Sequence, residues 1–240
     1  MKILRTIRQD LMEKNKTLKY LKYAIGEIFL VTVGILIAVQ VNSYMTFKND
    51  RQIEKKVFIE LKHDLQKDTT DLNNLLQIKK EQWAQCHWVL DIFNNPHQKI
   101  ADSAQFMNNI RKPFYFYIDN PHKTAFELAK SSGDLFKITN DSLINKISVY
   151  FTDNDATQFL ATNKKFSAEY MSNVFMRNHK FNYDNFQKFK DDFLNDFEME
   201  NYYVMLITYV DVSIDLISKK RMKAIKLMED IDNEMLHLNK

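Results

Sequence analysis

The sequence predicts an all-α membrane protein, in which an N-terminal transmembrane helix precedes long helices that form a helical-bundle or coiled-coil-like ectodomain. Three observations predict this fold: few turn formers, one long apolar stretch, and long segments with helical spacing of apolar residues. The 240 residues include three glycines and three prolines, whereas average usage gives roughly 17 and 12. Because tight β-hairpins depend on glycine at positive φ, so few glycines argue against a strand-rich fold.

The apolar stretch is Tyr23–Val41, with the sequence YAIGEIFLVTVGILIAVQV. Nineteen helical residues span about 28 Å, close to the thickness of the hydrocarbon layer. Its centre, Ile28–Val39, contains nothing more polar than Thr32, so a buried helix of a soluble domain is the weaker alternative. No small-residue cleavage site follows, which favours an uncleaved signal anchor over a cleaved signal peptide.

Basic residues before the anchor predict its orientation. Residues 1–22 carry seven Lys or Arg and two acidic residues, whereas the four basic residues of 42–61 alternate with acidic ones. The positive-inside rule then places the N-terminus in the cytoplasm and the C-terminal domain in the periplasm of a Gram-negative cell. The basic tail either lies on anionic lipid as an amphipathic helix or serves only as this signal. Since the basic charge is local, no nucleic-acid partner is expected.

A second pattern within the anchor predicts that it associates with another copy of itself. Mostly small residues recur at alternating spacings of three and four, and Gly34-xxx-Ala38 permits close approach of two backbones. The predicted helix–helix interface comprises Ala24, Glu27, Val31, Gly34, Ala38 and Val41. The expected partners are the lipid bilayer, further copies of the chain in a homo-oligomer, and a periplasmic protein.

Glu27 lies about one turn inside the cytoplasmic end of the anchor. A carboxylate within a membrane helix is costly and is often functional. One interpretation is structural, with Glu27 facing a neighbouring helix or reaching the membrane surface. The alternative is an ion- or proton-handling carboxylate, as in an energy-coupling or channel-like membrane subunit.

The rest of the chain divides by pattern. Apolar residues recur at helical spacing through a long amphipathic helix that ends before Pro96, and all three prolines fall within the next segment. Gly133 is a predicted left-handed helix cap, and Asn140 is a predicted N-cap. The expected organisation is a basic cytoplasmic tail (1–22), a transmembrane signal anchor (23–42), a long amphipathic helix (43–95), an aromatic loop (96–123) and a helical bundle (124–240).

Two segments carry a resemblance to a known family. The first comprises Tyr23–Glu27, Gly34–Ala38 and Asn42, and the second is Thr124–Phe151. Together they resemble membrane-anchored proteins of Bacteroidota that form a family of unknown function. In that family a Trp commonly lies near the anchor exit, where this chain has Tyr44. The resemblance implies a bacterial inner-membrane protein with one exported domain, and it implies no activity.

Motifs for catalysis or metal binding are missing from the sequence. No two of the six histidines are three or four residues apart, and there is no Cys/His cluster, so no metal site is expected. Cys86 is the single cysteine and is expected to be buried and inert. So few glycines exclude a glycine-rich phosphate loop. The sequence therefore predicts a protein without cofactors that is not an enzyme: an assembly or scaffold protein.

Overall fold

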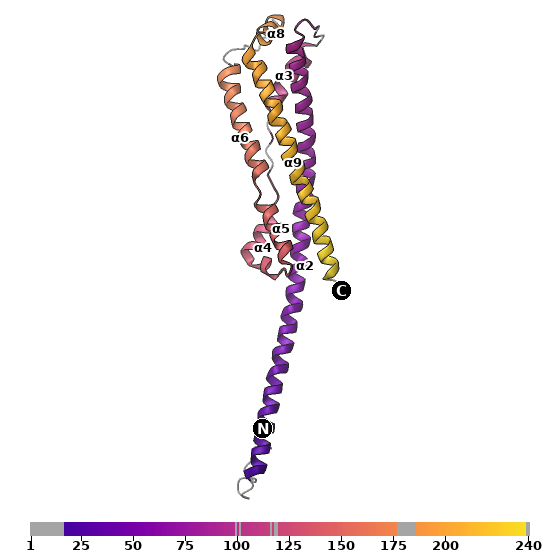
Figure 1. Ribbon diagram of the computed structural model, residues 1–240, viewed down its shortest axis with the longest axis vertical. Helices are drawn as coiled ribbons and strands as arrows, with labels where there is room; N and C mark the ends of the chain where they lie inside the picture. The colour runs from indigo at the N-terminus through magenta and orange to yellow at the C-terminus, as the bar shows by residue number, and fades with distance from the viewer. Residues whose placement is uncertain are drawn as a thin grey trace. The chain divides into compact units, whose positions relative to one another are not determined.

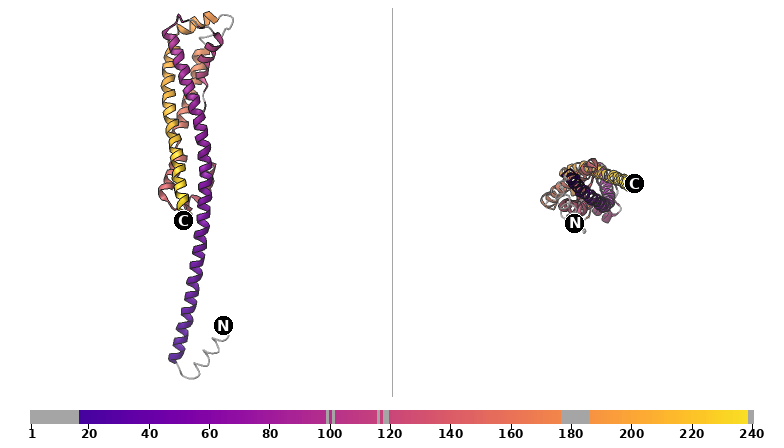
Figure 2. Two further views of the ribbon diagram at one scale, coloured as in Figure 1. Left: turned by 90° about the vertical axis from the view of Figure 1, so that its right-hand side faces the viewer. Right: turned by 90° about the horizontal axis from the view of Figure 1, so that it is seen from below.

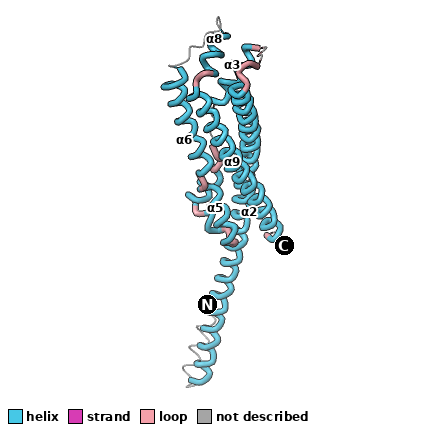
Figure 3. Tube along the Cα trace, turned by 45° about the horizontal axis from the view of Figure 1, so that its top comes forward, coloured by secondary structure: helices cyan, strands magenta, loops and turns pink. Residues whose placement is uncertain are grey.

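The computed structural model describes residues 17–98, 100, 102–115, 117, 120–176 and 186–238. Over these residues the backbone forms helices, turns and loops, and no strand occurs (Figure 3). The all-α prediction is confirmed, with one long apolar N-terminal helix followed by further helices. The expected amphipathic helix in the basic tail falls mostly outside the described residues.

The helices follow one another in the order α2, α3, η1, α4, η2, α5, α6, η3, α8 and α9 (Figure 1). Their bounds are Thr17–Asn94, Ser103–Arg111, Lys112–Phe114, Thr124–Ser132, Asp134–Lys137, Asp141–Thr152, Asp155–Tyr170, Met171–Phe175, Phe186–Leu194 and Phe197–His237. The segments η1 and η2 are 3₁₀-helices, and η3 is a π-helix.

The chain forms two compact units, unit 1 (Met1–Glu54) and unit 2 (Lys55–Lys240). Helix α2 contributes to both, because it runs without a break from Thr17 to Asn94. The predicted anchor (23–42) and the predicted amphipathic helix (43–95) are therefore parts of one helix. The intervening polar segment contains no proline or glycine that would end a helix.

Within unit 2, α9 lies antiparallel to the second part of α2, and α6 lies along α9 (Figures 1 and 2). An ion pair of 2.5 Å between Lys62 of α2 and Asp232 of α9 joins the start of one helix segment to the end of the other. The short helices α4 and α5 pack at the Lys62 end, whereas α3 and α8 lie at the opposite end (Figure 1).

Three clusters of buried side chains form the core of unit 2. The first joins Phe58 and Leu61 of α2 to α4, α5 and the end of α9. A small middle cluster contains Leu72, Leu160 and Ile217. The third is rich in aromatic rings, which meet edge-to-face or stack as aromatic pairs prefer. Helix α9 contributes side chains to all three clusters, so it takes part in the whole core of unit 2.

Local signals in the sequence explain several helix ends. Gly133 has a φ of 80° and ends α4, which confirms the predicted left-handed cap. Asn140 accepts a hydrogen bond from the Leu143 N–H at 3.1 Å, which confirms the predicted N-cap of α5. Asp196 caps α9 in the same way.

The prediction of a loop over 96–123 is wrong for Ser103–Arg111, which form α3. Asp102 caps this helix by accepting hydrogen bonds from the N–H groups of Ala104 and Gln105. Its apolar residues Phe106 and Ile110 enter the aromatic cluster, and this burial stabilises a helix too short to form alone.

Candidate functional site

The apolar part of α2 in unit 1 is the first candidate site. Among the described residues, α2 is the one helix long and apolar enough to span a membrane. None of its most apolar stretch is buried in the protein. The hydroxyl of Thr32 donates to the Ile28 carbonyl at 2.8 Å, so this polar group is satisfied within the helix.

Two exposed tyrosines flank the apolar part of α2. Tyr23 precedes it and Tyr44 follows it, with exposed fractions of 58% and 66%. The helical rise from Tyr23 to Tyr44 is about 32 Å along the axis, which matches the thickness of the hydrocarbon layer. Tyrosine is enriched at both membrane–water interfaces because its ring is apolar and its hydroxyl is polar. The tyrosine spacing is therefore a second indication of a membrane span.

The six predicted interface residues all lie on the helical part of unit 1. At 100° per residue, Ala24, Glu27, Val31, Gly34, Ala38 and Val41 fall within a sector of about 100°, so they share one face of α2. A Cβ placed on Gly34 would meet no atom within 4 Å. The structure thus brings these residues onto one open face, and binding of a second helix there stays a prediction.

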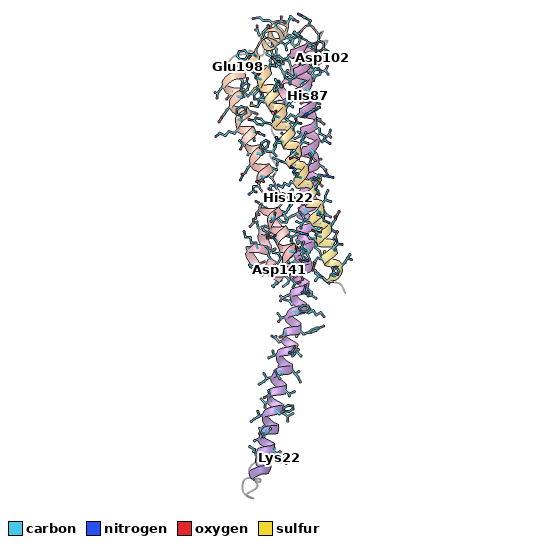
Figure 4. The ribbon with its side chains drawn as sticks, in the orientation of Figure 1. Lys22, His87, Asp102, His122, Asp141 and Glu198 are labelled. Carbon is cyan, nitrogen blue, oxygen red and sulfur yellow. The ribbon has the colours of Figure 1, made fainter. Side chains whose placement is uncertain are left out.

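Buried carboxylates of α2 form the second feature, which lies in unit 2. Asp64 accepts a hydrogen bond from the Ala125 N–H at 2.8 Å, so it caps the start of α4 from another helix. Asp68 accepts from the His122 N–H at 2.6 Å and from the Tyr150 hydroxyl at 2.8 Å. The His122 side chain, near the middle of unit 2 in Figure 4, is partly exposed. These bonds position α4 and α5 against α2.

A lysine is buried further along α2. The Lys79 side chain is 2% exposed and donates to Gln82 Oε1 at 2.9 Å, while the Gln82 amide donates to the Pro113 carbonyl. Burial lowers the pKa of Lys79 to about 8. Burial also raises the pKa of the Cys86 thiol to about 12, so this cysteine is buried as expected and is a poor nucleophile.

A groove between α5, α6 and α9 in unit 2 has a volume of about 670 Å³. Apolar side chains and five lysines line this lysine–aspartate groove, together with Asp153, Asp155 and Asp230. Lys146 donates to Asp230 at 2.7 Å, and Lys223 donates to Asp153 at 2.7 Å. The hydrogen bond from Lys146 lowers the pKa of Asp230. The lysine charges of the lysine–aspartate groove are thus largely neutralised by neighbouring carboxylates.

A second groove lies between η1, α6 and η3 and has a volume of about 470 Å³. This η1–α6 groove differs from the first because, among the described residues, two cations and no carboxylate line it. Its lining comprises Arg111, Phe114, Tyr115, Lys164, Ser167, Ala168, Met171, Ser172 and Met176. The π-helix η3 begins at Met171, and π-helical turns often occur at functional sites.

No group of three His, Cys, Asp or Glu side chains is arranged to hold a metal ion within the part of the chain that the structure describes. The absence of a metal site, of cofactors and of catalysis therefore stays a prediction. Sequence reasoning missed both grooves and the buried Asp64 and Asp68. The two aspartates repeat every fourth residue beside the apolar positions Leu61 and Leu65, which is a signal that they face the core.

The comparisons with known proteins agree with the resemblance at the level of the family alone. No match was found among curated proteins or solved structures. The profile of a family of unknown function, DUF6090, matches residues 27–210. This match begins at Glu27 within the apolar part of α2 and ends in α9, so it includes elements of both units. The match covers most of the chain, which therefore belongs to the DUF6090 family.

Proposed function

We propose that this chain is a non-enzymatic, membrane-anchored assembly or scaffold protein. The observation that carries the proposal is the exposed apolar part of α2, attached to a unit that buries its own core. An apolar surface of this length is stable only in lipid or against another apolar helix. Unit 2 has a different composition, with charged surfaces and two grooves, which suits binding of another protein.

The proposed location is the bacterial inner membrane, with the N-terminus in the cytoplasm and unit 2 in the periplasm. The excess of Lys and Arg in residues 1–22 supports this orientation. Fusions at the C-terminus test it, because alkaline phosphatase is active only when it is exported. An active phosphatase fusion is expected, and an inactive phosphatase with a fluorescent cytoplasmic reporter would reverse the orientation.

Self-association through the Gly34 face of α2 is the proposed basis of assembly. Gly34→Leu adds bulk where two backbones approach, and we expect it to weaken association about tenfold, which corresponds to about 1.4 kcal/mol. Leu36→Phe is the matched control, since it adds bulk about 200° around the helix from Gly34. Native mass spectrometry of the full chain in detergent measures both. A wild-type chain that is monomeric at every concentration would exclude this basis of assembly.

A second candidate function rests on Glu27, whose side chain is exposed on the apolar part of α2. In an energy-coupling or channel-like subunit this group would bind and release a proton or a cation. Glu27→Gln separates the two functions, because it preserves size and hydrogen bonding but cannot ionise. Intact assembly with loss of proton or cation flux into proteoliposomes would favour the second function. Intact assembly with no flux in either protein favours the scaffold.

A further inference from the structure

The η1–α6 groove of unit 2 has positive charge that no carboxylate of the described residues pairs with. Arg111 and Lys164 are both exposed on its lining. Neither forms an ion pair or a hydrogen bond with any carboxylate of the described residues. In the lysine–aspartate groove, by contrast, the lysines Lys146, Lys219, Lys223 and Lys226 form ion pairs. The η1–α6 groove is therefore suited to an anionic partner.

The floor of the same groove is apolar and adaptable. Phe114, Ala168 and the methionines Met171 and Met176 contribute to its lining. Met176 is 64% exposed. Methionine side chains are flexible and polarisable, and they are common on surfaces that bind apolar groups of other proteins. A suitable occupant therefore combines an apolar side chain with carboxylates.

The start of α9 has this complementary chemistry. Phe197 is 70% exposed, and Glu198 and Glu200 are exposed on either side of the buried Met199. The two glutamate carboxylates form no ion pair within the described residues. The Asp196 carboxylate already accepts hydrogen bonds from the Glu198 and Met199 N–H groups at the start of α9. Phe197, Glu198 and Glu200 are named here the acidic tip.

The acidic tip adjoins the η1–α6 groove on the surface of unit 2. The Tyr170 hydroxyl donates to the Glu198 carbonyl at 3.0 Å, and Tyr170 directly precedes Met171 of the groove lining. Figure 4 shows Glu198 at the end of unit 2 that carries α8. A basic apolar groove beside an acidic apolar tip makes one self-complementary surface. Such a surface can form a closed twofold contact, in which each copy supplies a groove and a tip.

We propose that two copies of unit 2 pair through this surface, so that the acidic tip of each copy occupies the η1–α6 groove of the other. Phe197 enters the apolar floor, while Glu198 and Glu200 approach Arg111 and Lys164. Charge complementarity supports a second copy as the occupant, because the chain itself provides both halves. The proposal deepens the proposed assembly function, since it adds a contact between exported units to the association of the anchors.

Directed cross-linking in native membranes tests the contact with the full chain. Ala168→Cys places a thiol in the groove, and Asn201→Cys, in a separately tagged copy, places one beside the acidic tip. Cys86 can remain, because it is buried and its pKa is raised. A short bis-maleimide is expected to join the two tags. The matched control pairs Ala168→Cys with Lys219→Cys on the lysine–aspartate groove, and its yield is expected to be about tenfold lower.

Charge exchange makes the test specific. Lys164→Glu and Glu198→Lys each replace an attraction by a repulsion, so each alone is expected to reduce the Ala168–Asn201 cross-link about tenfold. A chain with both substitutions restores complementary charges, and its cross-linking yield is expected to return toward the wild-type value. Failure of the double variant to recover would overturn the proposal, and so would a tip-to-groove yield equal to the control yield.

A third cross-link separates this proposal from the proposed function. Ala38→Cys on the anchor face reports association of the membrane helices through a disulfide between two copies. An anchor cross-link without a groove-to-tip cross-link would overturn the pairing of unit 2 and leave the anchored assembly intact. Absence of both cross-links would contradict the pairing and the assembly function together.

Discussion

The two parts of α2 belong to one continuous helix, but they differ in which side chains they expose and which they bury. In unit 1 the helix exposes large apolar residues such as Phe29, Leu30 and Leu36. In unit 2 the same helix buries Asp64, Asp68 and other polar groups. Exposed apolar groups require lipid or a second apolar helix, whereas buried polar groups require hydrogen-bond partners from the chain itself. The contrast teaches that unit 1 depends on its surroundings and unit 2 depends on its own fold.

The largest expected effect tests whether unit 1 depends on its surroundings. Ile35→Arg combined with Ile37→Arg places two charges near the centre of the apolar span. Each Arg raises the free energy of membrane insertion by roughly 2.5–3.5 kcal/mol, so the pair raises it by about 5–7 kcal/mol. We expect the variant to leave the membrane pellet on alkaline carbonate extraction. The control, Ile35→Leu with Ile37→Leu, should stay in the pellet, and retention of the double Arg variant would contradict a spanning helix.

The second expected effect concerns the buried carboxylates. Asp68→Ala removes the acceptor of the Tyr150 hydroxyl and of the His122 N–H. Each donor left without an acceptor costs about 1–3 kcal/mol, so the free energy of unfolding should fall by about 2–6 kcal/mol. Urea unfolding followed by circular dichroism measures this fall. Asp71→Ala is the control, since its pair with His122 is exposed and should contribute less than about 1 kcal/mol. Equal losses would remove the distinction between buried and exposed carboxylates.

The smallest expected effect is an increase in the free energy of unfolding, on replacement of Lys79. Because burial lowers the pKa of Lys79 from 10.5 to about 8, the unfolded chain holds this proton more tightly than the folded chain. Lys79 is therefore destabilising below pH 8, and its cost declines as the pH rises from 8 to 10.5. Lys79→Met should raise the free energy of unfolding at pH 7 by about 1–3 kcal/mol.

Unfolding in urea at several pH values checks the linkage at Lys79. The difference in stability between Lys79→Met and the wild type should shrink between pH 8 and pH 10.5. Subtraction of the two curves cancels the contribution of the buried tyrosines, which titrate in both proteins. The exposed Lys80→Met is the control and should show no such trend. A constant difference would mean that the buried amine is charged throughout this range.

Much of the fold follows from local patterns in the sequence. The scarcity of glycine and proline predicted helices, and Gly133 and Asn140 marked two helix ends that the structure confirms. Helix α3 was not predicted, because prolines on either side of it are typical of a loop and nine residues give a weak periodic signal. Its cap, Asp102, was the local signal that could have shown it.

The candidate sites were less predictable than the fold. Residues of the anchor face share one helix, so their spacing in the sequence is enough to place them together. The η1–α6 groove instead joins Arg111 to Lys164, and the sequence separation of these residues carries no information about their proximity. The same holds for Tyr170 and Glu198, which a tertiary hydrogen bond brings together.

Helix α9 has a consequence for biosynthesis. It is the last helix that the structure describes, and it supplies Tyr203, Ile217 and Ile231 to the three separate core clusters. During synthesis, every other helix of unit 2 emerges before any cluster is complete. A nascent or truncated chain therefore leaves apolar residues of α2, such as Phe58, Leu72 and Val89, without their partners on α9 until that helix docks. Chaperones and proteases bind exposed apolar residues, so we expect a chain without α9 to be degraded faster than the full chain.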